Sequence, residues 1–248
     1  MRPVTLVRDL LDFCYPPACA GCGEACDAQQ FLCTSCLSQL QTVELAAACE
    51  RCGAPVAYPE APCPFCNGKG VHYYKRILRL GTFSEPLKTL IHEMKYNGRW
   101  SLGEQLADRL LAQKRIRAML EYVDVIAPMP LHRWRHLRRG YNQAAVIAVR
   151  VARKVPRPIV WPVTRTRNTE TQTHLHSRQE RIRNLRNAFK LRNPSVIAGK
   201  HVLVIDDVTT TGATLQSFAR TLRRAKPASL TALVIAIADP KHRDFQVV

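Results

Sequence analysis

The segment from 202 to 214 places residues that can bind a sugar phosphate directly after an apolar run. The run 202–205 predicts a buried strand, and helical spacing begins at residue 213. Ligands of open α/β sheets bind at the carboxyl ends of strands, where the turn into the next helix offers backbone N–H groups and the positive end of the helix dipole. Six residues of this turn are therefore predicted to bind a phosphate monoester: Thr209, Thr210, Thr211, Gly212, Ala213 and Thr214.

Two carboxylates, Asp206 and Asp207, stand between that strand and the turn. Because carboxylates repel a phosphate, they must face hydrogen-bond donors or a cation. The 2- and 3-hydroxyls of a ribose would satisfy them, with magnesium nearby. A tight strand–helix turn capped by threonine is the alternative interpretation. It accounts for the hydroxyls but not for paired aspartates at the exit of a buried strand.

Eight cysteines near the N-terminus form the pattern C-x2-C-x10-C-x2-C twice, with each cysteine recurring 30 residues later. Two such C-x2-C turns supply the four thiolates of a closed, structural zinc site. The equal spacing favours two sequential sites over interleaved pairing or disulfides. Cys26 is a spare thiol that could compete as a ligand, and Cys14 is interpreted as a packing residue. The predicted ligands are Cys19, Cys22, Cys33 and Cys36 for the first zinc, and Cys49, Cys52, Cys63 and Cys66 for the second.

The rest of the chain alternates predicted strands and helices, which must position the turn and its aspartates. Strands are expected at 77–83, 122–127, 158–161, 201–205 and 230–238, and helices at 87–96, 102–120, 142–152 and 213–225. Continuous apolar runs alternating with helices predict an α/β fold with a mostly parallel, doubly wound sheet. We therefore expect an N-terminal helix and a small double zinc ribbon over residues 1–70, followed by the α/β domain over 71–248.

The basic charge is concentrated in one internal stretch. The whole chain has a formal net charge of +18, and residues 128–201 hold 17 Lys and Arg against two Asp and Glu. Solvated surfaces usually mix both signs. An Arg-rich solvated face remains the alternative, but the near absence of acids favours an anionic partner such as nucleic acid or a phosphate-rich small molecule.

These motifs together resemble the ComF family, whose members are linked to competence and the use of external DNA. The segment 202–214 is similar to the phosphoribosyl-pyrophosphate motif of type I phosphoribosyltransferases. Pro128-Met129-Pro130-Leu131 leads into an Arg-rich segment and then Gly140-Tyr141-Asn142-Gln143, and the cysteine repeat fits the double-zinc-ribbon version of the family. The resemblance covers essentially the whole chain and implies a type I phosphoribosyltransferase-like fold.

The resemblance also implies roles for individual residues. Asp206 and Asp207 engage the ribose, a loop around 130–139 meets the pyrophosphate, and a mobile hood around 165–176 closes over the site. Cleavage at C1 of the ribose leaves negative charge on pyrophosphate, which guanidinium groups and magnesium stabilise. Gln172 is expected in hood closure or acceptor contact, and His174 and His176 are either proton carriers or solvated surface residues. The candidates for the guanidinium clamp are Arg133, Arg138, Arg139 and Arg167.

Two functions follow from these motifs. The first is magnesium-dependent transfer of a phosphoribosyl group from its pyrophosphate to an unidentified acceptor, with Asp206, Asp207 and Arg167 as the catalytic residues. The second is a non-catalytic protein that binds single-stranded DNA and partners of the DNA-uptake machinery. A charged N-terminus without a signal-peptide core predicts a cytoplasmic protein, and no apolar run reaches the roughly 18 residues of a membrane helix.

Overall fold

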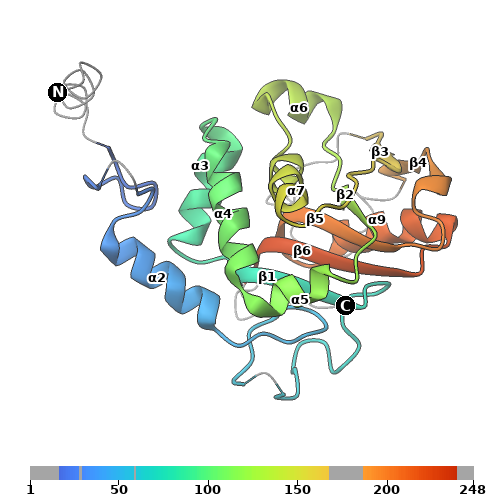
Figure 1. Cartoon of the computed structure of the whole chain (residues 1–248), viewed down its shortest axis with the longest axis horizontal. Coiled ribbons are helices and arrows are strands. Elements are labelled where there is room, and N and C mark those ends of the chain that lie inside the picture. Colours follow the sequence, from blue (N-terminus) through green and yellow to red (C-terminus); the bar gives the residue numbers. More distant parts are fainter. Residues whose placement is uncertain (1–16, 28–29, 59, 168–186, 239–248) are drawn as a thin grey trace.

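A four-stranded parallel sheet forms the centre of the computed structural model, which describes residues 17–27, 30–58, 60–167 and 187–238 (Figure 1). The two inner strands are buried along most of their length because they carry continuous runs of Val, Leu, Ile and Ala. In order across the sheet, the strands are β1 (Arg76–Thr82), β6 (Ser229–Ile237), β5 (His201–Thr209) and β2 (Val125–Pro128).

Helices cover the sheet as expected for a doubly wound fold. The chain moves in one direction from β1 to β2 and in the other from β5 to β6, so right-handed crossovers place the connecting helices on opposite faces. Figure 1 shows α3, α4 and α7 together in front of the sheet. The helices of the α/β region are α3 (Leu87–Tyr96), α4 (Ser101–Ala112), α5 (Lys114–Leu120), α6 (Arg133–Arg139), α7 (Gln143–Lys154) and α9 (Ala213–Leu222), with short 3-10 turns at Pro194–Val196 and Arg223–Ala225.

Several predicted elements were wrong in detail. The helix expected over 102–120 is two helices, because Gln113 has extended dihedrals (φ −74°, ψ 114°) between them. The strand expected at 158–161 is reduced to one parallel bridge between Ile126 and Ile159. The strand expected at 201–205 continues to Thr209, so both aspartates lie within β5.

Three elements were not predicted. The segment 130–139, expected as a loop, contains α6. Its sequence has no apolar stripe, so the helix buries no side chain and periodicity could not indicate it. An antiparallel pair, β3 (Val163–Arg165) and β4 (Phe189–Leu191), borders the expected hood, and the adjoining residues 168–186 lie outside the described part of the chain.

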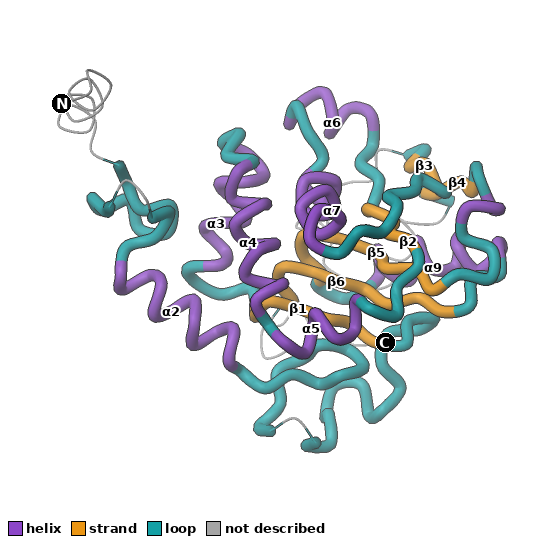
Figure 2. Tube along the Cα trace, viewed as in Figure 1, coloured by secondary structure: helices purple, strands orange, loops and turns teal. Residues whose placement is uncertain are grey.

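The N-terminal region packs on one face of the edge strand β1. Alternate residues 77, 79 and 81 share that face. Gly53 of the second cysteine repeat lies against Ile77, and Gly81 lies beneath Val43 of α2 (Thr34–Leu45). The first cysteine repeat ends inside α2, which contains Cys36, and Figure 2 shows the described part of the second repeat as loop. The Arg109 side chain of α4 donates to both carboxylate oxygens of Glu44, one of them at 2.6 Å, and so ties the same helix to the core.

Gly81→Ala is expected to lower the free energy of unfolding by about 1–3 kcal/mol, because overpacking forces neighbours apart. A Cβ at this position would lie 2.3 Å from Cγ1 of Val43. The double variant Gly81→Ala, Val43→Ala should recover most of that loss in urea unfolding. Equal stability of Gly81→Ala and the wild type would contradict this contact.

Candidate functional site

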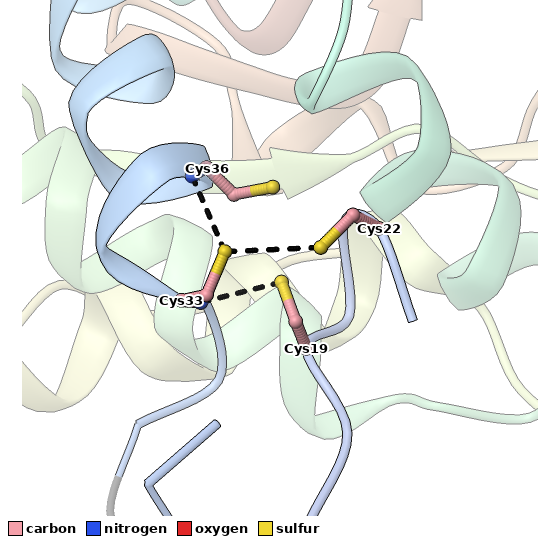
Figure 3. Close-up of side chains that lie close together, drawn as sticks. All are labelled: Cys19, Cys22, Cys33 and Cys36. Carbon is pink, nitrogen blue, oxygen red and sulfur yellow. Dashed lines mark hydrogen bonds between the residues drawn. The ribbon is translucent and has the colours of Figure 1, made fainter. Parts of the chain in front are cut away.

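The eight cysteines form two separate quartets, as the repeat predicts. Within each quartet all four Sγ atoms lie within 4.8 Å of one another. Figure 3 shows the side chains of the first quartet pointing toward a common centre. The Sγ–Sγ distance is 3.7 Å between Cys22 and Cys33, and 3.6 Å between Cys52 and Cys63. Four thiolates around zinc at about 2.3 Å are separated by about 3.8 Å in a tetrahedron, so both quartets fit the ion.

The two quartets differ in exposure although their sequence pattern is the same. All four cysteines of the second quartet are buried, whereas Cys22 of the first is exposed. Burial raises the pKa of the Cys19 thiol, but N–H donors including those of Cys33 and Gly21 outweigh it and lower that pKa to about 6. Cys26 lies outside both quartets with its thiol 3.6 Å from the Gln30 carbonyl oxygen, and Cys14 is outside the described residues.

Metal analysis of the full chain should give about two zinc equivalents. A colourimetric chelator should remove zinc from the first quartet faster than from the second, because Cys22 is exposed while the second quartet is buried. A Cys22→Ser variant should lose only the fast phase of release. A single equivalent, or two that leave at the same rate in the wild type, would contradict this assignment.

The turn after β5 combines buried and accessible threonines. Thr210 and Thr214 line a cavity of about 660 Å³. Thr209 and Thr211 are buried, and the Thr211 hydroxyl accepts a hydrogen bond from the Ala213 N–H at 3.4 Å. Gly212 has φ +72°, a left-handed conformation that favours glycine, and begins α9. Of the six predicted turn residues, Thr210 and Thr214 therefore present hydroxyls to the cavity, and Thr214 lies in the first turn of α9.

Asp206 and Asp207 line the same cavity and differ in their surroundings. The Asp207 carboxylate forms an ion pair with Lys95 of α3, with Nζ and Oδ2 3.0 Å apart. The Asp207 N–H donates to Oδ1 of Asp206 at 2.9 Å. Burial and the neighbouring Asp207 charge raise the pKa of Asp206 to about 7. Near neutral pH, Asp206 therefore carries a proton for part of the time and Asp207 faces a cation.

Three arginines on two elements complete the cavity wall: Arg135 and Arg139 of α6 and Arg165 of β3. Burial, the positive charge of Arg135 and that of Arg139 lower the pKa of Arg165 to about 10, although Asp206 opposes the shift. Burial and Arg139 likewise lower the pKa of Arg135. Cations that destabilise one another in this way create a positive potential that an anionic ligand relieves.

Only part of the predicted clamp reaches this cavity. Arg139 does, but Arg133 lines another cavity, and Arg138 and Arg167 are exposed. In a helix, residues four apart share a face, so Arg135 and Arg139 point the same way while Arg133 and Arg138 point elsewhere. Sequence reasoning missed Lys95, Arg135 and Arg165 as site residues. The i, i+4 spacing of the arginines would have indicated Arg135 had the helix been recognised, while Gln172, His174 and His176 lie outside the described residues.

The other cavity, of about 900 Å³, lies between α6, α7 and β3. Its wall includes three aromatic side chains and several cations. Trp100 and Trp161 are about half exposed, at 53% and 46%. The aromatic side chains are Trp100, Tyr141 and Trp161, and the cations include Arg133 and Arg192.

The fold and these sites define a phosphoribosyltransferase-like protein with an N-terminal double zinc ribbon. Residues 137–246 match the model of the phosphoribosyl transferase domain, and residues 10–67 match the double zinc ribbon domain. The chain is 37% identical over 183 residues to the DNA utilization protein YhgH of Salmonella typhimurium, covering 71% of this chain and 78% of that protein. It is 31% identical over 202 residues to competence protein F of Haemophilus influenzae, covering 79% and 86%. The chain belongs to the ComF family.

Among solved structures, the chain is similar to the glutamine phosphoribosylpyrophosphate amidotransferase of B. subtilis. The match has 19% identity and a TM-score of 0.35, and it covers 56% of this chain and 26% of that one. Among the described residues, none of the helices is both long enough and apolar enough to cross a membrane.

Proposed function

We propose that the 660 Å³ cavity binds phosphoribosyl pyrophosphate with magnesium and that the protein transfers the phosphoribosyl group to an acceptor. One observation carries this proposal. The paired aspartates at the end of β5, the hydroxyl turn that follows them and a wall of cations from α3, α6 and β3 all face one cavity. In this donor, the ribose hydroxyls require the aspartates, the 5-phosphate requires the turn, and the pyrophosphate requires the cations.

Each group has a distinct task in the proposed site. Backbone N–H groups of the turn, with Thr210 and Thr214, hold the 5-phosphate. Asp206 and Asp207 accept hydrogen bonds from the ribose hydroxyls. Arg135, Arg139 and Arg165 stabilise the negative charge that collects on pyrophosphate as the C1–O bond breaks.

The donor set also fits magnesium. Carboxylate and phosphate oxygens are the ligands that this ion prefers. The Asp207 carboxylate already faces a cation, because the Lys95 ammonium lies 3.0 Å from it. When bound, magnesium neutralises charge on the pyrophosphate and helps it to leave.

Calorimetric titration of the full chain with phosphoribosyl pyrophosphate and magnesium tests the proposal. The double variant Asp206→Asn, Asp207→Asn should weaken donor binding by about 100-fold or more, which corresponds to about 2.7 kcal/mol. Arg135→Gln should weaken it more than Arg138→Gln, because only the Arg135 side chain lines the cavity. Saturable donor binding that survives the double aspartate change would reject this site.

A second candidate function is single-stranded DNA binding at the 900 Å³ cavity, since the relatives are named for DNA utilization and competence. There, Trp100 and Trp161 could stack bases while Arg133 and Arg192 contact phosphates. In that function the chain also contacts DNA-uptake proteins. It would do so in the cytoplasm, a reducing compartment in which cysteines remain available as zinc ligands.

Fluorescence titration with a single-stranded oligonucleotide at several salt concentrations tests this candidate. Affinity should fall steeply with salt. Trp161→Ala should weaken binding about tenfold, in line with the 1–3 kcal/mol of a base–aromatic stack. Tyr122→Ala is the matched control, since Tyr122 is also an exposed aromatic, at 71%, but lies outside this cavity. Undetectable or salt-independent binding would exclude DNA from the cavity.

A further inference from the structure

A third cavity, of about 640 Å³, lies at the end of the sheet opposite the proposed donor site. Its wall includes Arg76, which begins β1, and Ser229, which begins β6, whereas the donor site lies at the carboxyl end of β5. The second cysteine repeat and its linker supply Arg51 and Lys69. The two cavities share no lining residue, so this one is a separate site.

The cavity wall is strongly basic. A single carboxylate, Glu50, stands among five permanent cations on the wall. In the described part of the chain, no ion pair involves any of these five cations. Since five cations gathered in a hollow with one carboxylate repel one another, the cavity favours an anion with several negative charges. The five cations are Arg51, Lys69, Lys75, Arg76 and Arg223.

The back of the cavity is rigid. Val71 and Tyr74 are buried, and they contact the start of α9 or the residue before it. The Tyr74 hydroxyl donates to the Leu215 carbonyl oxygen of α9 at 3.1 Å. A Cβ on Gly212 would lie 3.4 Å from Cγ1 of Val71. The hollow is therefore held open by core packing and does not have to be formed by the ligand.

Tyr73 adds an aromatic ring and a strained backbone to the cavity rim. Its φ is +75°, a conformation that side chains of this size rarely adopt and that costs about 1–3 kcal/mol. The ring is 37% exposed and lies 3.9 Å from the His72 ring at 66°. The strained backbone therefore keeps an aromatic face at the edge of a basic hollow.

We propose that this cavity binds an oligophosphate, either inorganic or as the phosphate chain of a nucleotide. Arg51, Lys69 and Lys75 contact the phosphates by charge-assisted hydrogen bonds. If the oligophosphate belongs to a nucleotide, its base stacks on Tyr73.

The test is calorimetric titration of the zinc-loaded full chain with tripolyphosphate and, separately, with ATP, both at 0.15 M salt without magnesium. Ribose 5-phosphate in excess occupies the turn after β5. Lys69→Gln with Lys75→Gln should weaken tripolyphosphate binding by about tenfold or more. The matched control, Arg220→Gln with Arg224→Gln, removes two exposed cations outside the cavity and should bind within about twofold of the wild type.

Equal affinity of the two double variants for tripolyphosphate would overturn the proposal, because both have the same net charge. Tighter binding of ATP that Tyr73→Ala reduces to the level of tripolyphosphate supports a nucleotide. Equal binding of the two probes supports an inorganic oligophosphate. Lys69→Gln with Lys75→Gln leaves the cavity at the end of β5 unchanged. Failure of the proposed phosphoribosyl pyrophosphate site would therefore appear separately, as absent binding of that compound to the wild type.

Discussion

A Cys52→Ser variant is expected to lose about 3 kcal/mol or more of its free energy of unfolding, because an incomplete zinc site would sit inside the packed core. Cys52 is 1% exposed, and the neighbouring Gly53 packs on Ile77 of β1 and Ile237 of β6. Burial raises the pKa of the Cys52 thiol, so without zinc this residue is a buried neutral thiol that is no longer joined to its three partners through a metal. Unfolding of the second cysteine repeat would therefore expose apolar side chains of β1 and β6 to solvent.

Cys22→Ser provides the matched control, since it also removes one zinc ligand but changes an exposed residue of the first quartet. All three tryptophans, Trp100, Trp134 and Trp161, lie beyond residue 70, so their fluorescence during urea unfolding reports on the α/β region. We expect the Cys22→Ser midpoint to stay close to that of the wild type. Equal losses in the two variants would show that burial does not distinguish the two zinc sites.

Asp206→Asn is expected to stabilise the unliganded protein by about 2–4 kcal/mol at pH 8 and by much less at pH 5. Burial, followed by repulsion from Asp207, raises the pKa of Asp206 to about 7. A carboxyl with a raised pKa keeps its proton in the folded state at pH values where the unfolded chain has released it. The wild type therefore loses stability as the pH rises from about 4 to about 7, and the asparagine variant does not lose this contribution.

The measurement is the free energy of unfolding in urea at pH 5, 6, 7 and 8, without donor or magnesium. Asp207→Asn is the comparison variant. Removal of this carboxylate breaks the ion pair between Asp207 and Lys95 at 3.0 Å but also relieves the repulsion on Asp206, so the gain at pH 8 should be smaller than that of Asp206→Asn. A stability difference between Asp206→Asn and the wild type that is the same at pH 5 and pH 8 would contradict the raised pKa.

The parts of the site that the sequence predicted depend on local spacing. Two C-x2-C turns must converge on one ion, so the cysteine pattern sufficed to pair Cys19 with Cys36 and Cys49 with Cys66. The run after 202 likewise contains its own strand, aspartates and helix start. The parallel sheet was predicted because its inner strands are continuous apolar runs.

The parts that sequence reasoning missed depend on tertiary packing or on a helix without an apolar face. Lys95 reaches Asp207 only because the tertiary fold brings the last turn of α3 close to β5, across more than a hundred residues of chain. Arg135 was passed over because the arginines of α6 were interpreted as a loop, in which the four-residue spacing has no directional meaning. The predicted roles of Arg133, Arg138, Arg167 and Gln172 remain predictions.

Gly53 of the second cysteine repeat contacts the sheet of the α/β region. Position 70 separates the cysteine repeats from the α/β region in the sequence, yet Gly53 of the second repeat packs against Ile77 and Ile237 of the sheet. A chain shortened to begin at residue 71 would expose Ile77 of β1 and Ile237 of β6 to solvent on the face that Gly53 covers. We therefore expect the second cysteine repeat to stabilise the α/β region against unfolding, even though composition places a boundary between the two.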